Sequence, residues 1–274
     1  MIRILNLMDN SSSGHKALRT EHGLSLHIRT QNFSFVFDFG QSDATMRNAE
    51  ALGVDPAKVS CAICSHSHYD HVGGYLKFAD AQMRCPLVVG RDFFDEKYSA
   101  LGGAFKYTGV NFEETDLAKR SVGLRECSDI EELGDGVFAV SGFSPKNEFE
   151  TLNPSFVRLA RGNFSTDDFR EETCIVIDAP DGLCAIVGCS HVGIVNILES
   201  ISKRFGKRVS ILIGGTHLAE ASEERIAKTA AYFVESGIRT AALNHCSGEK
   251  INAAIAADAR ITGIPLGAGA CVFL

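Results

Sequence analysis

Four side chains that can bind a metal ion lie within six consecutive residues. His66, His68, Asp70 and His71 come directly after the apolar run 59–64. In an extended backbone, positions two apart point to the same side, so His66 and His68 can bind one cation. Asp70 and His71 can serve a neighbouring site once the chain turns. Imidazole with carboxylate favours Zn²⁺, Fe or Mn over Ca²⁺ and Mg²⁺. This density of ligands favours a metal site over a pH-sensitive surface loop or a set of helix caps.

A sheet with helices between its strands must position these side chains. The apolar run 59–64 and the glycine pair at 73–74 predict a buried strand that turns into a helix, where sheet proteins often place reactive residues. Alternating hydrophobicity over 24–29 predicts a half-buried strand with His27 on its outward face. The same criteria predict strands at 2–8, 33–37, 86–89, 173–177, 183–187, 209–213 and 240–243, a hairpin turn at 178–182, and helices at 43–53, 73–80, 194–205 and 222–236.

The region from about 91 to 172 is the least regular part of the sequence. It has no histidine, many turn residues and aromatic residues without a clean period. Long loops in compact domains often form lids or substrate walls, and a flap that only covers apolar surface is the alternative. Because no linker, repeat or low-complexity segment interrupts the chain, we expect residues 1–274 to form one domain that carries this lid-like segment.

The composition restricts the class of protein. Of the 274 residues, 45% are hydrophobic and 22% are charged, and the formal charge of −7 argues against nucleic acid as a partner. No apolar run reaches the ~18 residues that span a bilayer, so no membrane partner is expected. Nine cysteines and a start unlike a signal peptide predict free thiols and a cytoplasmic location. Cys61 and Cys64 are expected in the core rather than in a zinc ribbon. The oligomeric state stays open.

The pattern His-x-His-x-Asp-His at 66–71, followed by Gly-Gly, resembles the signature of the metallo-β-lactamase superfamily. Other segments resemble one subgroup of it, namely 21–25, 37–42, 188–191, 214–218 and 244–248. That subgroup contains mostly metal-dependent hydrolases, and its methanogen members are known as dihydropterin ribofuranosylaminobenzene phosphate synthases. The resemblance extends from about residue 20 to about residue 250. It implies an α/β fold, the four-layer αββα sandwich, with one or two metal ions at one edge of the paired sheets.

The resemblance also implies which residues bind metal. The two expected ligand sets are His66, His68 and His191 for a first ion and Asp70, His71 and His245 for a second. His191 comes at a strand end and before a helix, where partial positive charge disfavours the imidazolium and leaves a lone pair free. The expected cofactor is one or two zinc ions, with manganese or iron as alternatives.

The sequence departs from the family pattern at one position. Many dinuclear relatives bridge their metals with an aspartate in a Gly-Asp pair at a strand end, where this chain has Gly188 and Cys189. A thiolate at Cys189 could bind a soft metal ion there. Alternatively, Cys189 could be a core thiol with no bridging residue. The number of metal ions therefore stays open.

Four other side chains are candidates for supporting roles. Asp38 resembles an aspartate that supports the metal loop by accepting hydrogen bonds from ligand residues, with an Asx turn as the alternative. His22 is expected either to contact substrate or to be a buried, hydrogen-bonded histidine. His217 is expected to bind substrate, to stabilise a leaving group, or to be structural. Glu150 is a candidate substrate contact because subgroup members carry an acidic loop residue there, although the usual Ile-Pro-Arg is missing.

Together, these features predict a metal-dependent hydrolase in which a metal-activated water attacks a small phosphorylated or cyclic ester substrate. With a single metal, Asp70 could act instead as the base that orients the water. The basic run 203–208 could attract an anionic substrate or form a solvated helix end. Because one fold hosts many reactions, two other functions stay open. One is a pterin-biosynthesis synthase with a methanopterin-type condensation, and the other is a non-catalytic metal-binding or sensing module.

Overall fold

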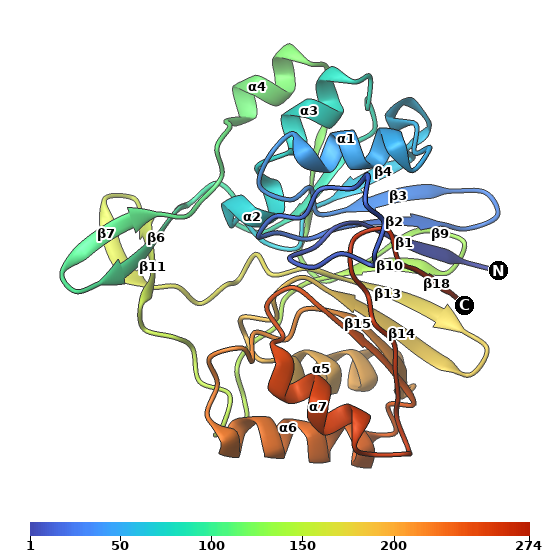
Figure 1. Ribbon diagram of the computed structural model, residues 1–274. Helices are drawn as coiled ribbons and strands as arrows, with labels where there is room; N and C mark the ends of the chain where they lie inside the picture. The colour runs from blue at the N-terminus through green and yellow to red at the C-terminus, as the bar shows by residue number, and fades with distance from the viewer.

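Two mixed β-sheets pack face to face, and helices cover their outer faces (Figure 1). The computed structural model describes all 274 residues. The layers follow the order helix, sheet, sheet, helix, so the expected αββα sandwich is confirmed. None of the helices is long and apolar enough to cross a lipid bilayer.

The first sheet has seven strands in the order β18-β1-β2-β3-β4-β5-β8. Its strands are β1 (Arg3–Met8), β2 (Ser25–Arg29), β3 (Ser34–Phe37), β4 (Cys61–Ile63), β5 (Leu87–Gly90), β8 (Leu124–Cys127) and β18 (Cys271–Phe273). Strands β3, β4, β5 and β8 run parallel, whereas the other pairs are antiparallel. The intervening helices are α1 (Ala44–Ala51), the 3₁₀ helix η1 (Pro56–Lys58), α2 (Tyr69–Val72), α3 (Tyr75–Asp80) and α4 (Glu114–Lys119).

The second sheet also has seven strands, in the order β17-β16-β15-β14-β13-β10-β9. Its strands are β9 (Ile130–Gly134), β10 (Val137–Val140), β13 (Cys174–Ala179), β14 (Gly182–Val187), β15 (Val209–Gly214), β16 (Thr240–Leu243) and β17 (Thr262–Gly263). Strands β14 to β17 run parallel. Its outer face is covered by α5 (Ile194–Phe205), α6 (Glu223–Ser236) and α7 (Glu249–Ala256) (Figure 1).

The central strands of both sheets are buried on both faces, which explains their nearly continuous apolar runs. A core of 20 buried residues, with Ile28 and Ile63 from the first sheet and Ile175 and Ile186 from the second, fills the space between the sheets. Two further cores of 22 and 25 residues lie between each sheet and its helices. The sandwich therefore holds the strand ends rigidly, and these ends carry the candidate site.

The segment 91–172 is more regular than expected. It contains strands of both large sheets and a separate four-stranded sheet in the order β12-β11-β6-β7, which projects from one side of the sandwich (Figure 1). Its strands are β6 (Glu96–Leu101), β7 (Ala104–Tyr107), β11 (Phe156–Ala160) and β12 (Asn163–Thr166). The expectation of an irregular segment was wrong because these strands pair with distant partners, whereas the lid-like role stays a prediction. The outer strands β7 and β12 are also exposed on both faces, so they lack an alternating pattern.

Local patterns elsewhere agree with the structure. The hairpin β13–β14 forms as predicted. Helix α6 begins after Ser222, whose hydroxyl accepts a hydrogen bond from the Arg225 amide, and ends at Gly237 in the left-handed conformation. The alternation over β2 was read correctly: Leu26 and Ile28 face the core between the sheets, and His27 lies on the opposite face with Arg29. That face is exposed at Arg29, but His27 is buried there, with 5% of its surface exposed.

Candidate metal centre

Segments that follow five strands meet at one edge of the sandwich. They follow β3, β4, β14, β15 and β16 and carry Asp38, 66–71, 188–191, 216–217 and 244–245. Parallel strands end at the same edge of a sheet, so side chains far apart in the sequence come together there. Seven of the nine histidines gather at this edge, and only His15 and His27 lie elsewhere.

Three of these histidines have a buried nitrogen without a partner. The ring centroids of His66, His68 and His191 lie 4.7 to 4.8 Å apart, and each Nε2 atom is buried with no hydrogen bond. Burial lowers the pKa of all three side chains, to about 4 for His68. The rings are therefore neutral at pH 7 and retain lone pairs that suit a metal ion.

Cys189 lies between the two expected ligand sets. Its Sγ atom forms one compact group with nitrogens of His66 and His191, and another with nitrogens of His71 and His245. Within each group all ligand atoms lie within 4.8 Å of one another. His68 belongs to neither group, although its ring is next to those of His66 and His191. The thiol of Cys189 is thus close to ligand atoms of both expected sets, and a bridging role for it stays a prediction.

The second expected set is also assembled. The Nε2 atom of His71 lies 3.2 Å from Sγ of Cys189 and 3.2 Å from Nε2 of His245. The Oδ2 atom of Asp70 lies 3.3 Å from Nε2 of His245 and 3.6 Å from Nε2 of His71. Burial works to raise the pKa of Asp70, but His71, His22 and His245 lower it well below its usual value. Asp70 is therefore a carboxylate among imidazoles.

Asp38 supports the metal loop, residues 66–71, through hydrogen bonds to the preceding Ser65. Its Oδ1 atom accepts a hydrogen bond from the Ser65 amide, and its Oδ2 atom accepts one from the Ser65 hydroxyl, both at 2.7 Å. The Ser65 oxygen lies 2.9 Å from Nδ1 of His66, so Asp38 also orients that ring through Ser65. A Cβ atom at Gly188 would lie 2.1 Å from the Ser65 oxygen, which explains the glycine there. These contacts favour the supporting role over an Asx turn.

His22 and His217 flank the two sets. The His22 side chain is 54% exposed, and its Nε2 atom lies 3.2 Å from Oδ2 of Asp70, so the alternative of a buried histidine was wrong. The half-buried ring of His217 lies 4.4 Å from that of His191. Burial lowers the pKa of His217 to about 4. A substrate role for either histidine stays a prediction.

Glu150, the other expected substrate contact, binds the amino end of α5. Its carboxylate accepts hydrogen bonds from the amides of Val195 and Asn196 at 3.0 and 2.9 Å, and from the Asn147 side chain at 2.8 Å. It therefore caps the amino end of α5 in place of Gly193, which has no side chain to do so. These contacts favour a structural role for Glu150, and a substrate contact by this residue stays a prediction.

Two residues that sequence reasoning missed hold His191 in place. Glu172 accepts hydrogen bonds from the amides of His191 and Val192 at 2.7 and 2.9 Å. The ring of Phe169 stacks on the ring of His191 with 4.1 Å between centroids. Neither residue belongs to a motif. The acidic pair 171–172 directly before an apolar strand was the only available signal.

A buried ion cluster joins the four-stranded sheet to the metal loop, and the sequence did not predict it either. The Nζ atom of Lys97, on β6, lies 2.7 Å from Oδ2 of Asp167 and 2.9 Å from Oε1 of Glu171. The Ser67 hydroxyl donates a hydrogen bond to the same Glu171 oxygen at 3.2 Å. Because Ser67 lies between two expected ligands, this cluster helps to fix the loop.

The side chains at this edge fit a divalent transition metal. Imidazole, carboxylate and thiol groups are the ligands of zinc, iron and manganese sites, and all three types are present here. Buried polar atoms without partners are costly in a folded protein. A bound cation would satisfy the three unpartnered Nε2 atoms, which supports the metal interpretation of the cluster.

Comparison with known proteins agrees with this geometry. The family model of the metallo-beta-lactamase superfamily matches residues 19–143. The chain is 28% identical to Tm1679, a metal-dependent hydrolase of the beta-lactamase superfamily known from a crystal structure. The two structures have a TM-score of 0.86, and the match covers 100% of this chain and 99% of that one.

Two proteins of Methanocaldococcus jannaschii are also similar. One is uncharacterised and is 27% identical over 255 residues, which cover 91% of each chain. The other is named 7,8-dihydropterin-6-methyl-4-(beta-D-ribofuranosyl)-aminobenzene-5'-phosphate synthase. It is 25% identical over 264 residues, which cover 91% of this chain and 88% of the synthase. The resemblance expected from the sequence is confirmed over most of the chain.

Proposed function

We propose that this protein, whose chain resembles the metallo-β-lactamase superfamily and has its fold, is a metal-dependent hydrolase of a small phosphorylated or cyclic ester substrate. One observation carries the proposal: the Nε2 atoms of His66, His68 and His191 are buried together and have no partner. Three neutral imidazoles kept free of hydrogen bonds beside a carboxylate and a thiol are what a catalytic metal site requires.

The chain's own residues divide into two sets that would hold the cofactor. His66, His68 and His191 would bind a first ion. Asp70, His71 and His245 would bind a second, with Cys189 between the sets. When bound, one or two divalent cations would supply Lewis acidity for a water nucleophile and for the scissile bond.

Residues around these sets would bind and orient the substrate. His217 is neutral at pH 7, since burial lowers its pKa to about 4, so it can exchange hydrogen bonds with a substrate or a leaving group. His22 faces Asp70 from the solvent side and would contact the part of the substrate that stays exposed. A cavity of about 830 Å³ beside His245 has the size of a small-molecule site.

The proposal is tested by turnover of bis(p-nitrophenyl) phosphate and of a small lactone, together with metal analysis of the purified protein. We expect activity that is lost on chelation and in His68→Ala, and retained in His15→Ala, which replaces an exposed histidine outside the cluster. If the metal-loaded protein turned over no ester, thioester or phosphodiester, the hydrolase proposal would fail. A shift of its melting temperature by a small molecule would then favour the non-catalytic module.

A second candidate reaction rests on the match to the dihydropterin synthase, which covers 91% of this chain. The same site would then join the 6-methyl carbon of a dihydropterin, activated by a leaving group, to a ribofuranosylaminobenzene phosphate, with release of that leaving group and a proton. Incubation of the metal-loaded protein with these two precursors, followed by mass spectrometry, distinguishes the two reactions. Formation of the joined product, absent in His68→Ala, would favour the synthase over the hydrolase.

A further inference from the structure

A second polar cavity lies at the end of the first sheet opposite the metal centre. Its volume is about 300 Å³, and it is lined by residues at the start of β1, β3 and β4, at the end of β2 and in the segment 53–58. Asp38 and the metal loop follow the other ends of β3 and β4. The length of the strands therefore separates this cavity from the expected metal ligands.

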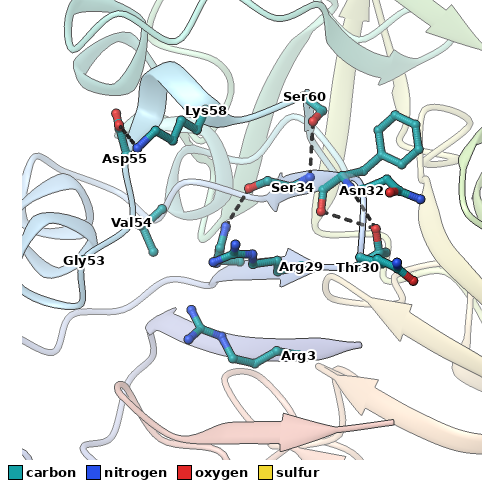
Figure 2. A pocket seen from close by; sticks show the side chains of 13 residues that line it. Arg3, Arg29, Thr30, Asn32, Ser34, Gly53, Val54, Asp55, Lys58 and Ser60 are labelled. Atoms are coloured by element: carbon teal, nitrogen blue, oxygen red, sulfur yellow. Dashed lines mark hydrogen bonds and ion pairs between the residues drawn. The ribbon is translucent and has the colours of Figure 1, made fainter. Parts of the chain in front are cut away.

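Two arginines face this cavity without a carboxylate partner. Arg3 and Arg29 lie directly opposite each other on the antiparallel strands β1 and β2. Figure 2 shows their guanidinium groups pointing to the same side, toward Val54. Of the charged side chains that line the cavity, only Lys58 and Asp55 form an ion pair. Like charges placed opposite each other destabilise a sheet, and neither arginine forms an ion pair that would offset this cost.

A buried histidine on the same face has one ring nitrogen without a partner. His27 lies two positions before Arg29 on β2, so both side chains point to the same side of the sheet. Its Nε2 atom lies 2.8 Å from the Ser34 hydroxyl, whereas its Nδ1 atom is buried and has no hydrogen bond. The Nε atom of Arg3 is likewise buried without a partner. Unsatisfied polar groups at a buried position suggest a missing ligand.

We propose that this cavity binds the phosphate group of a small hydrophilic molecule. Guanidinium groups bind phosphate oxygens through two parallel hydrogen bonds. Arg3, Arg29 and Lys58 carry three positive charges and Asp55 one negative charge, which leaves a charge of +2. A phosphate monoester carries a charge of roughly −1.5 to −2 at pH 7, so it matches this balance better than a single carboxylate does.

The rest of the lining indicates the remainder of the ligand. Only Phe33 and Val54 among the 13 lining residues are hydrophobic. Such a wall suits a polyol or a sugar rather than an acyl chain or an aromatic ring. The proposal does not depend on the metal centre, because no expected metal ligand lines the cavity.

Calorimetric titration of the metal-loaded protein in phosphate-free buffer tests the proposal, with glycerol 3-phosphate, inorganic phosphate and glycerol as probes. We expect glycerol 3-phosphate to bind and glycerol not to bind. Arg3→Gln and Arg29→Gln should each weaken binding by about tenfold or more, because each loses charge-assisted hydrogen bonds. Arg208→Gln, at an exposed arginine before β15 that forms no ion pair, should leave binding unchanged.

The remaining outcomes are also decisive. Equal affinity for inorganic phosphate would keep the phosphate site and identify the free ion as the ligand. Binding that is lost in His191→Ala but unchanged in both arginine variants would place the phosphate at the metal centre and overturn the proposal. Absence of binding to the wild-type protein would overturn it as well. Arg29→Gln should hydrolyse ester substrates at the wild-type rate, whichever of these binding results is found.

Discussion

The Oδ2 atom of Asp38 lies 2.6 Å from the Nδ1 atom of His71, and neither side chain is exposed to solvent. A carboxylate only accepts hydrogen bonds, so Nδ1 of His71 carries a proton and Nε2 faces Cys189, Asp70 and His245. Although burial works to lower it, Asp38 and Asp70 raise the pKa of His71. Asp38 therefore fixes the ring orientation of one expected ligand directly and of another, His66, through Ser65.

Asp38→Asn should weaken metal binding and hydrolysis by about 10–100-fold, as loss of an outer-shell carboxylate does elsewhere. Asparagine tolerates the left-handed backbone of Asp38, where φ is 60°, so the fold should persist. Zinc affinity measured by chelator competition checks this, with Asp181→Asn in the exposed β13–β14 turn as the control. Unchanged zinc affinity in Asp38→Asn would contradict the supporting role.

Loss of an outer-shell group weakens metal binding by about 10–100-fold. Cys189→Ser should weaken it by more than this, because a thiolate between the two sets would be lost. In the cobalt-substituted protein, a thiolate-to-metal charge-transfer band should disappear in this variant. Cys85→Ser, at a half-buried cysteine of the first sheet's outer core, should keep the band. A wild-type protein without the band would show that Cys189 is a core thiol.

Lys97→Met should destabilise the protein by about 3–5 kcal/mol, since it leaves the buried carboxylates of Asp167 and Glu171 without their cation. Equilibrium unfolding in urea measures the change. The triple variant Lys97→Met, Asp167→Asn, Glu171→Gln should recover much of the loss because no buried charge remains. Lys106→Met on the exposed strand β7 should change stability by less than about 0.5 kcal/mol. A loss of unfolding free energy below about 0.5 kcal/mol in Lys97→Met would argue against the buried ion cluster.

Glu150→Gln should lower stability by about 0.5–2 kcal/mol, the range of a lost helix cap, and leave kcat/KM unchanged. The reason is that both oxygens of Glu150 serve the amino end of α5 rather than the metal site. Glu148→Gln, at an exposed neighbour, is the matched control. A fall in kcat/KM without a change in unfolding free energy would identify Glu150 as a substrate contact.

His27→Gln should make the protein less sensitive to acid. Burial and the charges of Arg3 and Arg29 lower the pKa of His27 from 6.5 to about 4. Above pH 6.5 the His27 imidazole is neutral in the folded and in the unfolded protein. Between pH 6.5 and about 4, the unfolded chain binds a proton at His27 that the folded protein does not bind. Stability is therefore lost as the pH falls from 6.5 to about 4.

His27→Gln should remove roughly 3 kcal/mol of this acid-induced loss of unfolding free energy. The figure follows from the lowering of the His27 pKa from 6.5 to about 4, at about 1.36 kcal/mol for each pKa unit. Unfolding in urea at a series of pH values measures the difference from the wild type, with His15→Gln at an exposed position as the control. Parallel pH profiles for His27→Gln and the wild type would show that His27 does not titrate as argued.

Features that depend on neighbours in the sequence could be read from the residues alone. The spacing within 66–71 places four candidate ligands at one strand end, and alternation predicts β2. Ser222 and Gly237 mark the ends of α6. Each of these signals arises within a few residues, because backbone geometry sets which side chains share a face and which groups at a helix end need partners.

Partners far apart in the sequence were decided by the tertiary structure. Glu150 caps a helix 45 residues later, and Lys97 pairs with Asp167 across 70 residues. A buried polar group needs a partner, but that partner can come from anywhere along the chain. Strand order and register determine which distant side chains meet. They depend on the packing of both sheets at once, so no local pattern brings Glu172 to His191 or Arg3 opposite Arg29.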